Sequence, residues 1–172
     1  IFNSYNNIAS TYNSQDSLDK ALFYYNNCLT ILNQTSNNRK KSLLFNSLAS
    51  IYKKQGNLEK ALESAFKSLE IRLELNDKMY ISQSFISIAQ ILLQKGKIKG
   101  KEGALEYALK GHDLALEINF PAEIRASSLC LSEIYAQLGN AIESLEMYKL
   151  YIEKRDELKN IENDKAAIKS EL

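Results

Sequence analysis

Hydrophobic and small residues recur along the chain at intervals that fit one face of an α-helix. Within the stretch Leu48–Ala61, the residues Leu48, Ala49 and Tyr52 stand at positions i, i+1 and i+4, which lie on one side of a helix. Gly56-Asn57 follows them, and glycine adopts the left-handed conformation that ends a helix at little cost. A second apolar series begins directly after this turn. The stretch therefore predicts two antiparallel helices joined by a tight turn.

The same pattern occurs in four copies, and the first three are spaced by 40 residues. Each copy places a small residue on its first helix and another on its second helix, where a large side chain would overpack the contact. The first set is Ala9, Ala49, Ala89 and Ser132, and the second set is Ala21, Ala61, Ala104 and Ala141. Self-similarity at a fixed period is the signature of a stacked repeat array. We therefore predict an all-α solenoid of four helix–turn–helix repeats.

The pattern also predicts where the elements begin and end. Helices are expected at about 2–14, 18–34, 39–55, 58–75, 78–95, 102–118 and 121–138, with a last helix from about 140. Repeats at about 2–37, 38–77, 78–120 and 121–155 form a repeat domain over residues 1–155, and residues 156–172 form a helical extension. Ala104 follows Ala61 by 43 residues, and Ala141 follows Ala104 by only 37. We therefore expect a third turn with three extra residues, a fourth turn shortened by three, and a different crossing angle in the fourth hairpin.

The residues Leu-Ala-x-x-Tyr, then Gly-Asn-Leu, then Ala-Leu resemble the tetratricopeptide repeat, and the resemblance covers nearly the whole chain. That family folds as helix–turn–helix units that stack into a right-handed superhelix. Its usual repeat has 34 residues, so a 40-residue period implies helices about one turn longer. The proline that often ends the second helix of the family's repeat is missing, and Pro121 is placed to start a helix instead.

The end of the chain reads as one long helix. No turn signal interrupts the sequence after Tyr148, so a single helix is expected from about 141 to 172. An apolar edge at 3–4 spacing occupies about two heptads, with Lys165 at one of its positions, and consists of Leu158, Ile161, Ile168 and Leu172. Two interpretations stay open at this point: a capping helix on the fourth repeat, or a connector that forms a weak homodimer.

Composition limits the classes of partner. The net charge is +1 for 172 residues, so no global field favours nucleic acid or acidic lipid. No apolar run approaches the ~18 residues of a membrane span, and we expect no membrane contact by this chain. The chain begins at Ile1 inside an expected helix, which indicates a fragment of a longer protein.

Residues that carry chemistry are sparse. The sequence has no phosphate-binding glycine loop, His-Glu-x-x-His, Cys-x-x-Cys or Gly-x-Ser-x-Gly pattern, so we expect no enzyme activity, no catalytic residues, no cofactor and no metal site. Cys28 and Cys130 fall in the first and fourth repeats, too far apart for a disulfide. His112 stands where the first two repeats have Leu29 and Leu69, and this position indicates a packing role.

The surface of the array is the remaining candidate for function. In the family the first helix of each pair lines the concave side of the array, and polar residues there point away from the packed stripe. These are Asn6, Ser10, Asn13, Asn46, Ser50, Lys53, Ser87, Gln90, Gln94, Glu133 and Gln137. Amides donate and accept, so such a ladder suits an extended peptide backbone; the alternative is that any solvated groove is polar. Family clamps for a terminal carboxylate use several Lys, Arg and Asn residues, whereas this set holds one Lys.

We therefore predict a protein- or peptide-binding module. The segment 148–158, with Tyr151-Ile152 and Asp156-Glu157-Leu158, resembles the sensory arrays of bacterial two-component histidine kinases. In those proteins the array is typically extracytoplasmic, and its final helix leads to a membrane span and a kinase. Two alternatives are a cytoplasmic peptide-binding regulator, like the aspartate phosphatases and quorum-sensing regulators of Gram-positive bacteria, and a scaffold, as in kinesin light chains. The compartment stays open.

Overall fold

The computed structural model describes residues 1–35 and 37–170, with side chains as far as residue 166. Within these residues the chain forms eight helices and no strand. They are α1 (Phe2–Ser14), α2 (Leu18–Asn33), α3 (Asn38–Lys54), α4 (Leu58–Glu74), α5 (Lys78–Gln94), α6 (Ala104–Glu117), α7 (Pro121–Gln137) and α8 (Ala141–Ser170). The helix positions predicted from the sequence are confirmed to within about two residues.

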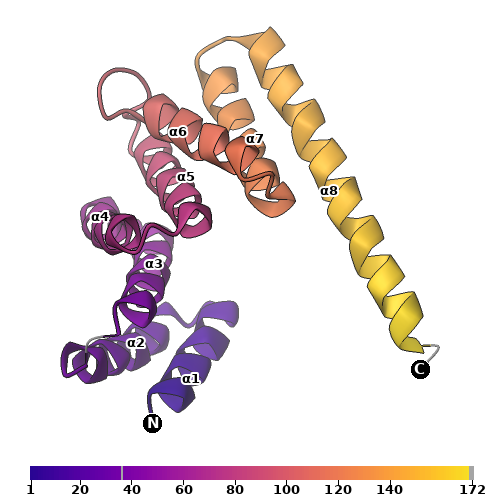
Figure 1. Ribbon diagram of the computed structural model, residues 1–172. Coiled ribbons are helices and arrows are strands. Elements are labelled where there is room, and N and C mark those ends of the chain that lie inside the picture. Colours follow the sequence, from indigo (N-terminus) through magenta and orange to yellow (C-terminus); the bar gives the residue numbers. More distant parts are fainter. Residues whose placement is uncertain (36, 171–172) are drawn as a thin grey trace.

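The helices form four antiparallel hairpins that follow one another along a curved path (Figure 1). Each helix packs against the next one in the chain, and the first helices α3, α5 and α7 also contact one another in order. Every hairpin is therefore packed mainly against its neighbours, as in an array with nearest-neighbour stabilisation. The predicted all-α solenoid is confirmed.

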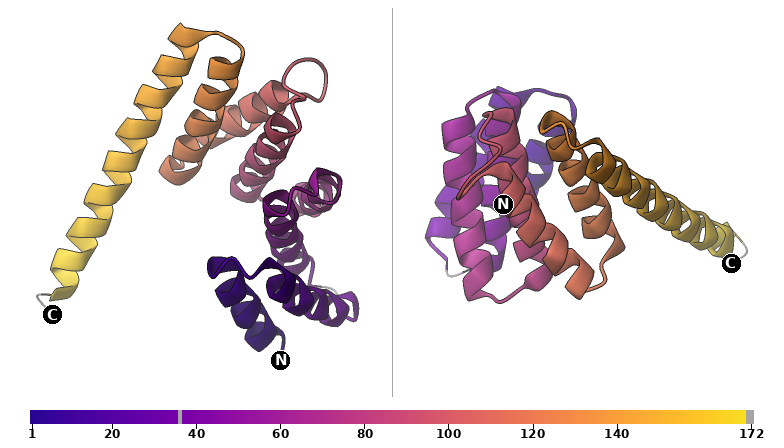
Figure 2. Two further views of the ribbon diagram at one scale, coloured as in Figure 1. Left: turned by 180° about the vertical axis from the view of Figure 1, so that it is seen from behind. Right: turned by 90° about the horizontal axis from the view of Figure 1, so that it is seen from above.

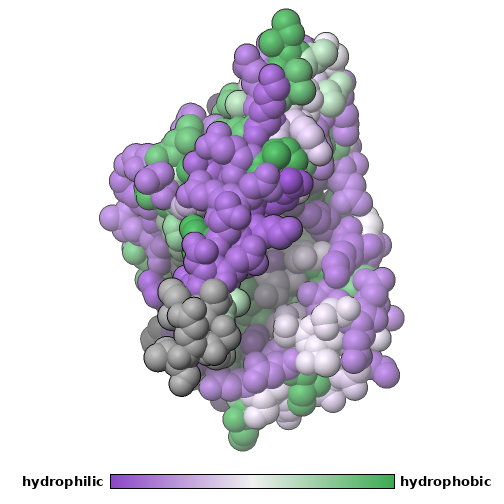
Figure 3. All heavy atoms as spheres, turned by 90° about the vertical axis from the view of Figure 1, so that its right-hand side faces the viewer, coloured by the Kyte–Doolittle hydropathy of each residue, from purple (hydrophilic) through white to green (hydrophobic). Residues whose placement is uncertain are grey.

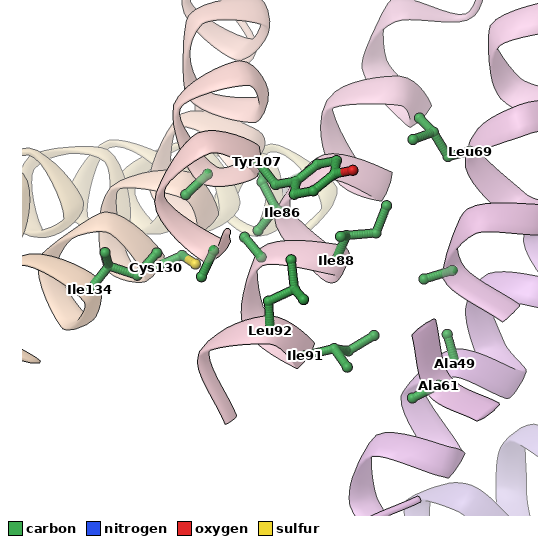
Figure 4. Close-up of a cluster of buried hydrophobic side chains, with 14 of the residues drawn as sticks. Ala49, Ala61, Leu69, Ile86, Ile88, Ile91, Leu92, Tyr107, Cys130 and Ile134 are labelled. Atoms are coloured by element: carbon green, nitrogen blue, oxygen red, sulfur yellow. The ribbon is translucent and has the colours of Figure 1, made fainter. Parts of the chain in front are cut away.

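Small residues let the two helices of each hairpin approach closely. Ala49 and Ala61 are both completely buried, and they lie near each other on adjacent helices (Figure 4). Their equivalents in the first and third hairpins are also completely buried: Ala9, Ala21, Ala89 and Ala104. Branched aliphatic side chains such as Ile88 and Ile91 fill the space between hairpins.

The fourth hairpin has a different register from the one predicted. Ala141 is exposed, and Ser132 instead pairs with Ser144 through two hydrogen bonds of 2.9 Å. Ser144 follows Ser132 by 12 residues, the same interval as from Ala49 to Ala61. The predicted contact of Ala141 with Ser132, and with it the shortened turn, was wrong. The physical reason is that Gly139-Asn140 closes α7 as Gly56-Asn57 closes α3, so the new helix starts with the usual spacing.

The last helix is long and continuous, as predicted. Its first half packs against α7, and its second half projects away from the array in both views of Figure 2. Leu158 is half-buried, and Ile161 is 39% exposed. The side chain of Ile168 and the whole of Leu172, which belong to the predicted apolar edge, lie outside the described residues.

Candidate functional site

The first helices of the last three hairpins line a groove of about 300 Å³. We name it the α3–α5–α7 groove. Five predicted site residues line it: Asn46, Ser50 and Lys53 from α3, and Ser87 and Gln90 from α5. The other lining residues are Gln83, Ile86, Ala122, Glu123, Arg125 and Ala126.

Helical spacing explains why these side chains meet. Asn46, Ser50 and Lys53 stand at i, i+4 and i+7 on α3, so they form one row along the helix. Gln83, Ser87 and Gln90 repeat the same spacing on α5. Since α3 and α5 contact each other directly, the two rows face a common space.

Lys53 bridges the two rows. Its Nζ donates a hydrogen bond to Gln90 Oε1 at 2.9 Å. Burial lowers the pKa of Lys53, and the attraction of Glu133 partly opposes that effect. No carboxylate of the described residues lies within ion-pair distance of this ammonium. The groove thus holds a partly desolvated cation whose described partner is a neutral amide.

Asn46 brings a buried polar atom without a partner. Its Oδ1 receives no hydrogen bond from any described residue. Buried acceptors of this kind are uncommon because the lost interaction with water is not replaced. A donor supplied by a ligand would satisfy this atom.

A buried arginine supports the groove from behind. Arg72 on α4 is 1% exposed, and its guanidinium donates to Gln83 Oε1 at 3.1 Å, to Ser84 Oγ at 2.7 Å and to the Tyr80 carbonyl oxygen at 2.9 Å. Burial lowers the pKa of Arg72 to about 10. These bonds fix Gln83, one of the groove residues.

The first two turns of α7 add charges that the sequence did not predict for the groove. Burial raises the pKa of Glu123, while Arg72 and Arg125 act in the opposite direction. Arg125 gives the groove a second cation beside Lys53, where the sequence indicated only one. Gln83 stands four residues before Ser87, and this helical spacing could have predicted that Gln83 lines the groove. Nothing in the sequence shows which turn of α7 reaches the groove.

The other predicted site residues lie elsewhere. Asn6 and Ser10 line a neighbouring hollow of about 380 Å³ between α1 and α3. Asn13 accepts a hydrogen bond from Lys54 Nζ at 3.1 Å. Gln94, Glu133 and Gln137 are exposed and line neither of these two hollows.

Residues with reactive side chains are engaged in packing. His112 is 7% exposed, its Nδ1 lies 2.8 Å from Ser127 Oγ, and burial lowers its pKa. Cys28 and Cys130 are buried free thiols, and burial raises the pKa of Cys130 to about 12. The described residues contain no cluster of three or more His, Cys, Asp or Glu side chains suited to a metal ion. In that same part of the chain, no helix has both the length and the apolar character needed to cross a bilayer.

Fold and groove together define a helical-repeat protein with a polar groove along its first helices. Residues 1–74 match the family model of the tetratricopeptide repeat. The crystal structure of BtubC (BKLC) from P. vanneervenii is similar in fold, with a TM-score of 0.78 at 16% sequence identity. That similarity covers 92% of this chain and 64% of the BtubC chain, so this chain spans less than two thirds of its length. No curated protein matches the chain in sequence.

The family match thus covers the first two hairpins, and the similarity to the solved structure shows a shared fold. Repeats of this family generally mediate protein–protein interaction, and they are typically non-catalytic. Neither comparison points to a histidine kinase.

Proposed function

We propose that the α3–α5–α7 groove binds an extended segment of a partner protein. The observation that carries this proposal is the buried, unpartnered Oδ1 of Asn46, which stands on the row that also holds Lys53. An extended peptide exposes an N–H and a C=O at each residue, so it supplies the donor that Asn46 lacks. The interaction role general to this repeat family agrees with such a site.

The charges of the groove favour a segment with an acidic side chain. Lys53 and Arg125 are its two cations, and Glu123 is its acidic lining residue. Since burial raises the pKa of Glu123, the negative charge of that carboxyl is disfavoured in the groove. An acidic ligand group near Lys53 would offset the desolvation of the ammonium.

A binding experiment tests the proposal. A random-peptide display library is selected on the unmodified protein, and the affinity of a recovered, fluorescently labelled peptide is measured by anisotropy. Replacing Asn46 and Gln90 together by Ala removes two polar partners worth about 0.5–1.5 kcal/mol each, so the affinity should fall roughly 5- to 150-fold. Gln94→Ala with Gln137→Ala is the matched control, since both residues are exposed outside the groove. Equal affinities for both double variants would move the site away from this groove.

We propose the sensory or interaction domain of a bacterial signalling protein, such as a histidine kinase, as the context of this module. The support is the resemblance of segment 148–158, through which α8 runs without interruption. In that context the projecting half of α8 pairs with the same helix of a second subunit. The alternatives are a cytoplasmic regulator and a scaffold. The gene sequence beyond residue 172 separates them: a membrane span and a kinase histidine motif, a DNA-binding helix-turn-helix, or a stop codon.

A further inference from the structure

The second helices α4 and α6 carry matching sets of solvent-facing side chains. Each residue of α6 lies 43 positions after its equivalent on α4, as Ala104 lies 43 positions after Ala61. At six such positions an acidic residue matches an acidic one, a lysine matches a lysine, and an apolar residue matches an apolar one. The α4 stripe consists of Glu63, Phe66, Lys67, Glu70, Leu73 and Glu74, and the α6 stripe consists of Glu106, Leu109, Lys110, Asp113, Leu116 and Glu117. All of these side chains are exposed or half-exposed.

Packing of the helices does not account for this match. Four buried positions that alternate with the stripe residues differ in chemistry between the two helices. At these positions α4 has Ser64, Ser68, Leu69 and Arg72, and α6 has Tyr107, Gly111, His112 and Ala115. Exposed positions ordinarily vary most freely, because substitutions at them alter stability little. The two helices therefore agree where folding constrains them least.

The other second helices lack the apolar part of the stripe. At the positions equivalent to Phe66 and Leu73, α2 has two asparagines, and α8 has a lysine and an aspartate in the register that Ser144 sets. These residues are Asn26, Asn33, Lys149 and Asp156, and all of them are exposed. Figure 3, which views the molecule from the side of α8, shows a mostly hydrophilic surface along that helix. A hairpin of this array therefore folds without apolar residues at these two positions.

The apolar members of each stripe stand seven residues apart, so they lie two turns apart on one side of their helix. Their exposed fractions are 40% for Phe66, 53% for Leu73, 37% for Leu109 and 47% for Leu116. Phe66, Leu73 and the buried Leu69 line a hollow of about 650 Å³, and the charged members of the α4 stripe complete its lining. The Phe66 ring meets the Tyr107 ring of α6 edge-on, with 5.9 Å between the centroids, so α4 and α6 touch at this surface.

Unpaired negative charge lies beside the apolar residues. The two lysines of the stripes are already paired, Lys67 with Glu63 and Lys110 with Glu106, each at 2.6 Å. Three carboxylates of the stripes have no ion-pair partner among the described residues, and these are Glu70, Glu74 and Asp113. A basic group of a ligand would meet uncompensated charge here, whereas an acidic group would be repelled.

We propose that the α4 and α6 stripes together bind an amphipathic helix of a partner protein. Apolar residues of that helix at i, i+3 or i+4 and i+7 pack against Phe66 and Leu73, because seven residues span about 10.5 Å on both helices. Lysine or arginine residues beside that apolar row face Glu70, Glu74 and Asp113. None of the stripe residues lines the α3–α5–α7 groove, so this surface is separate from the proposed peptide site.

Phage display of helical peptides on the full 172-residue chain tests this proposal. The library fixes leucine at i, i+3 and i+7 and allows Lys, Arg, Glu, Gln and Ser at the flanking positions. The enriched peptides should carry an excess of Lys and Arg. Their affinity, measured by fluorescence anisotropy, should fall as the NaCl concentration rises, because salt screens exposed charges.

Two double variants separate the apolar contribution from the charged one. Leu73→Gln with Leu116→Gln should weaken binding of an enriched peptide roughly tenfold or more, because two half-exposed leucines are lost from the contact. Glu70→Gln with Asp113→Asn should weaken it roughly 2- to 30-fold and reduce its salt dependence. Ile142→Gln is the matched control, since Ile142 is 73% exposed on α8 outside both stripes, and this variant should bind like the unmodified chain.

Four results would overturn the proposal. No helical peptide is enriched, the enriched peptides lack an excess of basic residues, or the leucine double variant binds them as the unmodified chain does. The fourth is that Asn46→Ala with Gln90→Ala abolishes binding while the leucine double variant retains it, which would assign the helix to the α3–α5–α7 groove. Circular dichroism and urea unfolding confirm that each variant is folded, so loss of binding is not confused with unfolding.

Discussion

Ser132 and Ser144 hold the last hairpin together by a reciprocal pair of hydrogen bonds. Each Oγ donates to the main-chain carbonyl oxygen of the other residue at 2.9 Å. Ser144→Leu should therefore lower the free energy of unfolding by about 1–3 kcal/mol, because a large side chain overpacks the contact. Ala141→Leu should change it by less than about 0.5 kcal/mol, because Ala141 is exposed and Leu18 and Leu58 occupy the equivalent position. Urea unfolding of both variants measures the difference. A greater loss of unfolding free energy for Ala141→Leu would show that Ala141, rather than Ser144, packs against Ser132.

The sequence located the helices well because each apolar series is closed by a turn of recognisable chemistry. The register of the fourth hairpin could not be chosen from residue size alone, since Ala141 and Ser144 are both small. The constant interval of 12 residues between the paired small residues of the first two hairpins selects Ser144. The third hairpin obscured that rule, because its loop carries three extra residues before Ala104.

The candidate groove was only partly predictable for a related reason. Helical spacing placed Asn46, Ser50 and Lys53 on one row, and the structure brings that row to the groove. The groove crosses the first helices obliquely, from the middle of α3 to the first turns of α7. Glu123 and Arg125 therefore line it, while Glu133, further along α7, does not. The angle between stacked helices decides this, and no local sequence pattern encodes it.

Gly111 is a second position where close packing should dominate. It lies inside α6, and an added Cβ would stand 2.9 Å from Ile86 Cγ1 and 3.2 Å from the Ser82 carbonyl oxygen. Alanine gains about 1 kcal/mol of helix propensity over glycine. The collision with main chain on α5 opposes that gain, so Gly111→Ala should lower the free energy of unfolding by about 1–2 kcal/mol.

Chemical denaturation again measures this effect, with Asp113→Ala as the control on an exposed position of the same helix. The control should change stability by less than about 0.5 kcal/mol. A Gly111→Ala protein that is more stable than the unmodified chain would mean that α5 moves away from α6 without cost.

His112 should make stability depend on pH. Burial lowers the pKa of the folded-state imidazole below its ordinary value of about 6.5, and the nearby Asp113 carboxylate only partly opposes that shift. The unfolded chain therefore binds the proton first as the pH falls, and protonation favours unfolding. The stabilising contribution of the neutral imidazole is full above about pH 6.5, is lost as the pH falls toward the folded-state pKa, and changes no further below it.

His112→Leu should remove this component of the pH dependence. The equivalent position in the second hairpin is occupied by Leu69, which is buried. Ser127 Oγ keeps its hydrogen bond to the Ile124 carbonyl oxygen at 3.0 Å, so no polar group in the core of the variant loses its last partner. Urea midpoints at pH 7.5 and pH 5.5 should differ more for the unmodified chain than for His112→Leu. Asp113→Asn should widen the difference, because removing the carboxylate lowers the pKa of His112 further. Identical pH dependence in all three proteins would show that His112 titrates alike in the folded and unfolded states, and the acid sensitivity would then belong to the carboxyl groups.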